Sequence, residues 1–389
     1  MFTYTTAGES HGNALTVIVD GVPAGLTLRE DGISRDLSRR RLAFGRGARQ
    51  ELETDEVLIT GGVHFGRTTG APVSMLIRNA EWELHHDDMD PSGERPDTYE
   101  EQTVPRPGHA DLEGLRKYGL TDCREVSERA SARETCARVA AGCVARELLA
   151  ELDVDVFSFV TGIGRAELRY TLDQVTGWDR IALETDELRC PDPGASGAMR
   201  AQIEAAASVG TSVGGSFCVV AEGLVPGLGG YARGADRLTA KLGAAVLSIP
   251  AVRGVEFGLG FESALLTGKE ALDTIVVDGA GNLSRSTNRA GGLEGGMTTG
   301  EALILRAAVK PVPTQEVPMG SVNLTTLEPA TAPVLRSDVC AVPSAAVVAE
   351  GEVAFVLARA YLEKFGSDCV ADMKAAVRQY RNRLKMMFR

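Results

Sequence analysis

Residues 8–21 read GESHGNALTVIVDG, and residues 210–223 read GTSVGGSFCVVAEG. In both stretches a glycine-rich turn opens a run of strand-forming residues, and an acidic residue followed by glycine closes it. This is the pattern of a strand that ends in a tight turn. Each stretch leads to a segment of helical character, residues 31–42 in the first copy and 235–246 in the second. We interpret the two copies as an internal duplication; the alternative is that glycine-rich strand boundaries resemble one another by chance.

The duplication predicts an α+β fold. Strands of each half would form one antiparallel sheet, and helices packed between the two sheets would share one apolar interior. We therefore expect a β-α-β sandwich with two pseudo-twofold related halves, about residues 1–200 and 201–389, in a single domain that spans residues 1–389.

Local signals indicate three helices and one loop. Ser131-Ala132-Arg133-Glu134 has the pattern of a capping box, in which the serine accepts from one free amide and the glutamate reaches back to another. Apolar periodicity then predicts a helix after Ser131, and further helices are expected over residues 345–364 and 371–385. Residues 81–105 are acidic, contain proline and lack periodicity, so we interpret them as a surface loop or lid.

The composition excludes several classes of protein. The chain has 389 residues, 44% of them hydrophobic, and a formal net charge of -12, which argues against a nucleic-acid partner. It contains neither a secretory signal pattern nor a run of about 20 apolar residues, so no membrane association is expected. The seven cysteines form no Cys-x-x-Cys pair, which favours a reducing, cytoplasmic location.

Two of the five histidines are candidates for acid–base chemistry. His11 lies between glycines that let backbone approach a ligand, and His109 lies in the stiff turn Arg106-Pro107-Gly108-His109-Ala110-Asp111. For either histidine alone, an ordinary turn residue is the alternative. The run from His85 to Asp90 has the composition of a metal site, but adjacent side chains rarely point at one centre and no His-x-x-x-His spacing accompanies them. We interpret this run as a solvated loop and expect no metal.

Arginines indicate an anionic ligand. Arg40, Arg46 and Arg49 belong to a dense basic segment whose guanidinium groups suit phosphate or carboxylate, the alternative being a solvated helix end. Arg129-Ala130-Ser131 stands where the capped helix begins, a natural anion site, although simple capping explains Ser131 as well. Neither residues 291–300 nor residues 310–314 match a dinucleotide or phosphate-loop pattern, which disfavours a Rossmann domain.

Taken together, seven ordered segments resemble the chorismate synthase family. They are residues 8–12, 40–49, 106–111, 129–135, 291–300, 310–314 and 336–338. The resemblance implies a lyase that carries out a 1,4-anti elimination of phosphate and the C6 proton from 5-enolpyruvylshikimate 3-phosphate. The product would be chorismate, at the last common step of the shikimate pathway of aromatic amino acid biosynthesis. Reduced FMN would be required without net redox change, and the family fold is a β-α-β sandwich assembled as a homotetramer.

The resemblance also implies residue roles. His11 would protonate the departing phosphate, His109 would supply or hold a proton at the reduced flavin ring, and Asp338 would assist proton removal at flavin N5. Ser10 and Ser131 would help relay protons. The implied FMN contacts are Arg129, Ala130, Ser131, Pro250, Ala251, Gly295, Lys310, Pro311, Val312, Pro313, Thr314 and Arg336, and Arg40, Arg46 and Arg49 would bind the substrate or NADP. Pro250 departs from the family pattern and removes a possible hydrogen-bond donor to the flavin.

One competing function stays open. A flavin reductase that uses NADPH, or a bifunctional enzyme that reduces its own flavin, would need similar arginines and glycines. It would not need two histidines placed to transfer protons.

Overall fold

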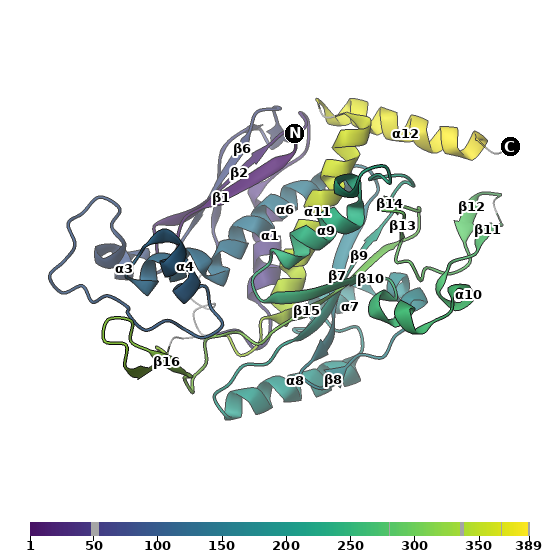
Figure 1. Cartoon of the computed structure of the whole chain (residues 1–389). Helices are drawn as coiled ribbons and strands as arrows, with labels where there is room; N and C mark the ends of the chain where they lie inside the picture. The colour runs from purple at the N-terminus through teal and green to yellow at the C-terminus, as the bar shows by residue number, and fades with distance from the viewer. Residues whose placement is uncertain (48–53, 280, 335–337, 367, 388–389) are drawn as a thin grey trace.

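The first sheet is formed by strands from the N-terminal part of the chain. The computed structural model describes residues 1–47, 54–279, 281–334, 338–366 and 368–387 (Figure 1). Four antiparallel strands lie in the order β1 (Thr3–Ala7), β2 (Ala14–Asp20), β6 (Val73–Arg78) and β3 (Val57–Gly61). In β2 the buried side chains alternate with more exposed ones, because one face of the sheet covers the core.

The second sheet contains five antiparallel strands. Their order is β10 (Val252–Phe257), β15 (Leu303–Val309), β9 (Gly215–Glu222), β7 (Asp155–Ile163) and β8 (Ala166–Glu167). Eight of the nine residues of β7 and five consecutive residues of β9 are buried. Apolar side chains therefore stand at neighbouring positions in these strands instead of alternating with polar ones.

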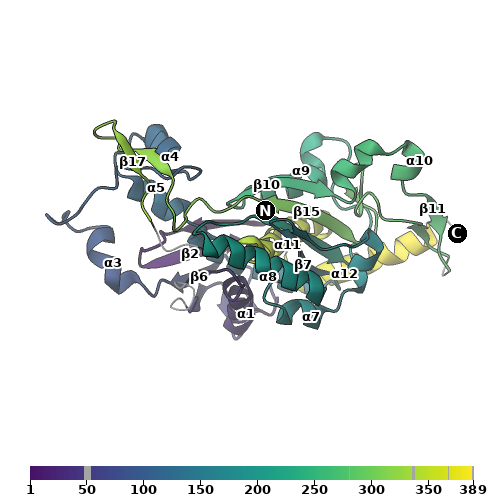
Figure 2. The ribbon, with the colours of Figure 1, turned by 90° about the horizontal axis from the view of Figure 1, so that it is seen from below.

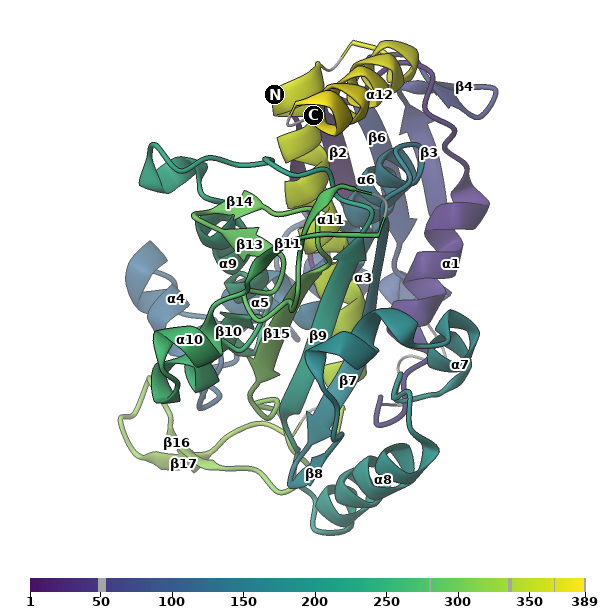
Figure 3. The same cartoon turned by 90° about the vertical axis from the view of Figure 1, so that its right-hand side faces the viewer.

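A layer of helices separates the two sheets. It consists of α1 (Glu30–Arg41), α6 (Thr135–Ala150), α9 (Leu238–Leu247) and α11 (Val342–Phe365). Helix α6 packs against β2, α11 packs against β7 and β9, and the two helices pack against each other (Figures 1 and 3). The predicted β-α-β sandwich is therefore confirmed, with one apolar core shared by both sheets.

The two sheets repeat one arrangement. The order β1-β2-β6-β3 of the first sheet corresponds to β7-β9-β15-β10 in the second, and the repeated sequence stretches fall on β2 and β9. Strand β7 belongs to the second sheet, although the predicted halves place its residues in the first. We propose that the boundary between the halves lies between α6 and β7; the assignment of residues 1–389 to a single domain stays a prediction.

Several short elements gather at one end of the sandwich. They are α3 (Trp82–Met89), α4 (Asp111–Tyr118), α5 (Cys123–Ala130) and the hairpin β16 (Gly320–Val322) and β17 (Pro329–Thr331) (Figures 1 and 2). Helix α3 corrects the interpretation of residues 81–105 as a loop throughout. None of its residues is buried, and Asp88 accepts from Arg124 of α5 at 2.8 Å, so a polar contact rather than an apolar stripe holds the helix.

The remaining elements connect these parts. They are β4 (Val63–His64), β5 (Arg67–Thr68), η1 (Ala132–Glu134), η2 (Leu172–Gly177), α7 (Arg180–Thr185), α8 (Pro193–Ser208), η3 (Gly234–Asp236), η4 (Gly260–Leu265), α10 (Gly268–Ala271), β11 (Ile275–Val277), β12 (Leu283–Arg285), β13 (Leu293–Glu294), β14 (Met297–Thr298) and α12 (Val370–Met386). Among the described helices, none combines the length and apolarity that crossing a bilayer requires.

Candidate active site

His11 lies in the loop between β1 and β2, where Glu128 of α5 binds it twice. The backbone amide of His11 donates to Oε2 of Glu128 at 2.8 Å, and its Nδ1 lies 2.8 Å from Oε1. Asn79, which follows β6, donates to the carbonyls of Glu9 at 3.0 Å and Gly12 at 2.6 Å and so fixes both sides of the loop. Because an ionised carboxylate only accepts, the proton of a neutral His11 lies on Nδ1 and Nε2 remains for chemistry.

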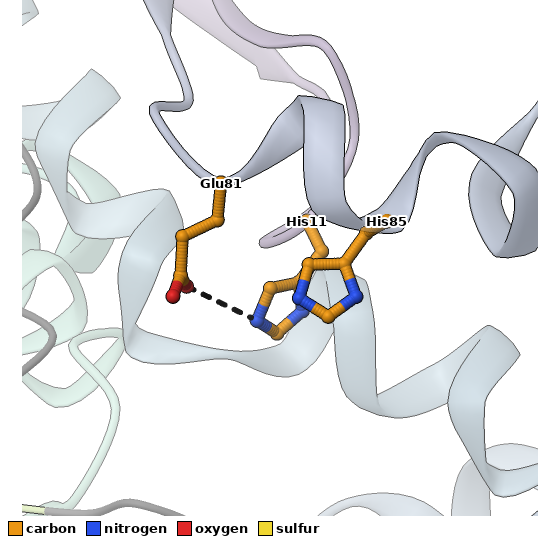
Figure 4. Close-up of side chains that lie close together, drawn as sticks. All are labelled: His11, Glu81 and His85. Carbon is orange, nitrogen blue, oxygen red and sulfur yellow. Dashed lines mark ion pairs between the residues drawn. The ribbon is translucent and has the colours of Figure 1, made fainter.

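Glu81 and His85, from the α3 region, lie next to the imidazole ring of His11. The Nε2 atom of His11 lies 3.8 Å from Oε2 of the buried Glu81, and the imidazole rings of His11 and His85 lie 4.4 Å apart (Figure 4). His85, expected to be solvated, therefore belongs to the surroundings of His11. Its neighbour His86 instead pairs with Asp87 at 2.8 Å and is half exposed.

His109 is held by a carboxylate in the same manner. Its Nδ1 lies 2.6 Å from Oδ1 of Asp111, and Arg106 donates from Nε to Oδ2 of the same carboxylate at 2.8 Å. Burial alone would raise the pKa of Asp111, but the hydrogen bonds from His109 and Arg106 outweigh it and hold the pKa well below its ordinary value. An ionised Asp111 accepts from Nδ1–H, although Nη2 of Arg106 also lies 3.0 Å from Nδ1, and this tautomer leaves Nε2 of His109 for another partner.

A pair of packed helices carries both carboxylates. Asp111 is the first residue of α4 and Glu128 lies near the end of α5. The helices approach closely at Gly114, where an added Cβ would lie 2.3 Å from Cγ1 of Val126. Asp122 accepts from the amide of Arg124 and so begins α5. The two candidate histidines are thus positioned by one structural unit.

The structure brings Ser10 and Ser131 together. Ser10 is buried, and the hydroxyl of Ser131 donates to Oγ of Ser10 at 3.2 Å. Ser131 caps η1 by accepting from the amide of Arg133, and α6 begins only at Thr135. The carboxylate of Glu134 pairs with Arg138 at 2.9 Å, so the predicted capping box is only partly formed.

Three predicted flavin residues, Arg129, Ala130 and Pro250, line one cavity of about 640 Å³. The cavity lies between β1, the start of α6 and the end of α9. The guanidinium of Arg129 donates to the carbonyls of Gly8 at 3.0 Å and Thr6 at 2.9 Å, so it also ties β1 to α5. A larger cavity of about 820 Å³ lies beside α1 and α7 and is lined by none of the predicted site residues.

Ala251 and Lys310 connect this cavity to the turn that carries His109. Ala251 has a φ of 69°, and its carbonyl accepts from the amide of Lys310 at 2.9 Å. The side chain of Lys310 donates to the carbonyl of Gly108 at 3.1 Å. Burial, and then the nearby charge of Arg253, lowers the pKa of Lys310.

The segment after Lys310 is fixed on both sides. The hydroxyl of Ser212 donates to the carbonyl of Val312 at 2.7 Å. A Cβ added to Gly108 would lie 3.7 Å from Cβ of Pro313, so the turn that carries His109 packs against this segment. The structure thus brings the predicted residues 310–314 to the same region as His109.

The basic segment packs deeper than expected. Arg40 is 2% exposed, and its guanidinium donates to Thr135 at 3.0 Å and to the carbonyl of Ala132 at 3.2 Å. Arg46 lies close by and donates to Oδ2 of Asp338 at 2.6 Å. Burial lowers the pKa of Arg46, an effect that the Asp338 carboxylate opposes. The assignment of Arg40 and Arg46 to substrate or NADP stays a prediction, and Arg49 and Arg336 lie outside the described residues.

Gly295 is placed apart from the other flavin candidates. It lies in the β13–β14 hairpin, next to Gly296, whose carbonyl accepts from the amide of Leu238 at the start of α9. Pro250 follows the other end of α9. A ten-residue helix is about 15 Å long, so Gly295 and Pro250 lie near opposite ends of that length.

The sequence analysis did not identify Glu81 and Glu128 beside His11, and it interpreted the third neighbour, His85, as part of a solvated loop. Glu128 directly precedes Arg129, but 117 residues separate it from His11. No local spacing marks such a pair. The only available signal was the adjacency of Glu128 to the predicted anion site.

The arrangement can hold and move protons beside an anionic ligand, since two oriented imidazoles lie near arginines, a lysine and a polar cavity.

A model of the chorismate synthase family matches residues 2–362. A chorismate synthase of Rubrobacter xylanophilus is 51% identical over 98% of this chain and 97% of the relative, and one of Desulforudis audaxviator is 46% identical over 99% and 98%. A crystal structure of chorismate synthase superimposes with a TM-score of 0.80 at 35% identity and covers 99% of this chain and 98% of the other.

These similarities extend over nearly the whole chain and agree with the observed layers. The molecule is an enzyme, a carbon–oxygen lyase. The chain belongs to the chorismate synthase family.

Proposed function

We propose that this enzyme converts 5-enolpyruvylshikimate 3-phosphate to chorismate by 1,4-anti elimination of phosphate and the C6 proton. Reduced FMN would be required without net redox change, at the last common step of the shikimate pathway. The observation that carries the proposal is the pair of imidazoles, His11 and His109, each with Nδ1 bound to a carboxylate at 2.8 Å and 2.6 Å. A reaction that must protonate one group and manage a proton at another needs two such residues.

His11 is the proton donor to the departing phosphate in this proposal. Glu128 stabilises the protonated imidazole, and Asn79 holds the loop, so Nε2 presents its proton in a fixed direction. A protonated phosphate is a better leaving group because less negative charge develops on it. Ser10 and Ser131, hydrogen bonded at 3.2 Å, offer a path for proton exchange beside the loop.

The residues present fit a reduced flavin. The cavity of about 640 Å³ falls within the roughly 300–1,000 Å³ typical of cofactor pockets. Arg129, Ala130, Ser131, Pro250, Ala251 and residues 310–314 would hold FMN, and we propose Gly295 and Arg336 as further contacts. When bound, the flavin supplies electron density to the substrate and recovers it.

The protein's own groups would manage charge and protons around that cofactor. His109, with its Nδ1 fixed by Asp111, would hold a proton on Nε2 beside an anionic ring, and Lys310 would add a positive charge to the same region. Asp338, oriented by Arg46 at 2.6 Å, is the proposed proton acceptor at N5. Arg40, Arg46 and Arg49 form the proposed site for the phosphorylated substrate or for NADP, and Arg40 acts there from a buried position.

We further propose that the enzyme is a cytoplasmic homotetramer. It would bind a small phosphorylated substrate and would bind neither nucleic acid nor a membrane.

The proposed reaction is tested by anaerobic turnover of 5-enolpyruvylshikimate 3-phosphate with chemically reduced FMN. Chorismate absorbance and phosphate release are followed together, and equimolar appearance of both is expected. FMN binding with NADPH oxidation but no chorismate would replace the lyase proposal by a flavin reductase, and chorismate formation driven by NADPH would indicate a bifunctional enzyme.

A further inference from the structure

We propose that His11, Glu81 and His85 form a binding site for a divalent cation of the zinc type, and that metal bound there blocks turnover by occupying His11. The inhibition rests on the proposed function, whereas metal binding does not. The site overlaps the proton donor but recruits two residues that the elimination itself does not use.

The ligand atoms already lie close together. One atom from each of the three side chains falls within 4.8 Å of the others, and Nε2 of His11 lies 3.8 Å from Oε2 of Glu81. A tetrahedral zinc site with bonds of about 2.0–2.1 Å separates its ligand atoms by about 3.4 Å. Small side-chain rotations therefore close the site. Figure 4 shows Glu81 and His85 facing His11 from one helical segment.

Helix α3 provides the spacing. Glu81 is its N-cap, and His85 follows four residues later, one helical turn along. Residues at i and i+4 lie on one face of a helix, which is how helices present two ligands to one metal. The pair does not match the His-x-x-x-His pattern because one of the two ligands is a carboxylate.

The surroundings of the site favour a metal. Nδ1 of His11 binds Glu128, which leaves Nε2 as the ligand atom, the carboxylate–histidine–metal arrangement common at zinc sites. Glu81 is 2% exposed, so its carboxylate and that of Glu128 place negative charge beside His11 where water screens it little. Arg124 of α5 donates to Asp88 of α3 at 2.8 Å, which fixes the helix that carries His85 to the helix that carries Glu128.

The donor set selects the metal. Two imidazole nitrogens and one carboxylate oxygen are typical ligands of Zn²⁺, whereas Mg²⁺ prefers oxygen ligands and retains its waters. Three protein ligands leave a fourth position for water or for an oxygen of a phosphate. A metal on Nε2 of His11 displaces the proton that this nitrogen would deliver to the leaving group.

Binding is tested by titrating Zn²⁺, and separately Mg²⁺, into the metal-free full-length chain by calorimetry. We expect one Zn²⁺ per chain and no measurable Mg²⁺ binding. His85→Ala should weaken Zn²⁺ binding at least tenfold, whereas His86→Ala, which alters the adjacent residue on the same helix, should change it less than twofold. Both variants keep all seven cysteines, so the comparison also separates this site from thiol binding. Equal affinity in the wild type and His85→Ala would overturn the site.

Glu81→Gln provides a second variant that keeps the shape of the side chain. It should weaken binding at least tenfold with an unchanged circular dichroism spectrum. Unchanged Zn²⁺ affinity in a folded Glu81→Gln protein would remove Glu81 from the ligand set and overturn the three-residue site.

Inhibition is tested with the anaerobic turnover assay. Zn²⁺ should abolish turnover of the wild type and of His86→Ala, and a chelator should restore it. The ratio of rates with and without Zn²⁺ should approach one in His85→Ala, whatever its rate without metal. Zn²⁺ binding without inhibition of an active wild type would overturn the inhibition. A protein that binds Zn²⁺ through His85 yet never forms chorismate would refute the proposed function and leave the metal site standing.

Discussion

Gly142 of α6 and Gly351 of α11 face each other where the two central helices cross. A Cβ added to Gly142 would lie 2.3 Å from the Cα of Gly351, so the backbones are in direct contact. Helices α6 and α11 occupy equivalent places in the two halves, each following the last strand of its sheet. The contact between the two glycines therefore lies at the centre of the repeated arrangement.

Gly142→Ala should destabilise the protein. The added methyl group forces the two helices apart and should lower the free energy of unfolding by about 1–3 kcal/mol, the usual range for overpacking a core. Urea unfolding followed by circular dichroism measures the change. Gly243→Ala is the matched control, since Gly243 lies inside α9 with nothing within 4 Å of an added Cβ. That variant should be stabilised by about 0.5–1 kcal/mol, and equal behaviour of the two would contradict the close crossing.

Glu128→Gln should slow turnover while the protein stays folded. The amide retains the shape of the carboxylate but cannot stabilise a protonated His11, so kcat should fall about 100-fold with little change in KM. Steady-state kinetics measure both constants. Glu125→Gln, on the first turn of the same helix, should keep the wild-type rate. A loss of substrate affinity without a loss of kcat would assign Glu128 to binding rather than to positioning His11.

His109→Ala should retain the fold and FMN binding but lose most turnover. The imidazole manages a proton and does not belong to the apolar core, so its removal should lower kcat by about 10²–10⁴-fold. FMN binding is followed by flavin fluorescence alongside the rate. Full activity in this variant would exclude His109 from proton transfer.

Asp111→Asn should lower stability in a manner that depends on pH. In the folded protein the pKa of Asp111 is held below its ordinary value, so its carboxylate stabilises the fold above about pH 4 and this contribution is lost as the pH falls further. At pH 7 the free energy of unfolding of the wild type should be higher than that of the variant by about 2 kcal/mol, as expected for hydrogen bonds to a charged group. When the free energy of unfolding is measured from pH 7 to pH 3, the difference between the wild type and the variant should become smaller. If this difference in the free energy of unfolding grew as the pH fell, the ionised carboxylate would not be stabilising the fold.

Asp338→Asn should reduce kcat with little effect on substrate affinity. The amide oxygen can still accept from Arg46, but the amide cannot take a proton, and its NH2 group replaces the oxygen that accepts from the amide of Gly47 at 2.8 Å. Rapid-mixing measurements of flavin absorbance and product formation give the rate, and fluorescence titration gives substrate affinity. An unchanged rate would show that another group handles the N5 proton.

The fold was largely predictable because its signals are local. The duplicated turn-and-strand pattern identified β2 and β9, apolar periodicity identified α6, and a helix was also expected over most of α11. Helix α3 could not be predicted in this way. Its eight residues bury no side chain, so they carry no apolar stripe.

The site was predictable only in part because its partnerships span the chain. His109 and Asp111 lie two residues apart, and the sequence already placed them in one turn. His11 and Glu128 are 117 residues apart, and Arg46 and Asp338 are 292 apart. The sequence therefore could not identify Glu128 as the partner of His11, because only the packing of α5 against the β1 end of the sandwich brings Glu128 to the loop that carries His11.

The two halves share one core but not the same connections. In the first half, β1 and β2 are joined by the six residues 8–13 that carry His11, whereas the equivalent strands β7 and β9 are joined by residues 164–214, which include β8, α7 and α8. A duplicated scaffold can tolerate such divergence because each connection lies outside the layers that hold the molecule together. Because the two sheets and the helices between them stabilise the fold, the segment that connects the strands in each half can differ in length, structure and function.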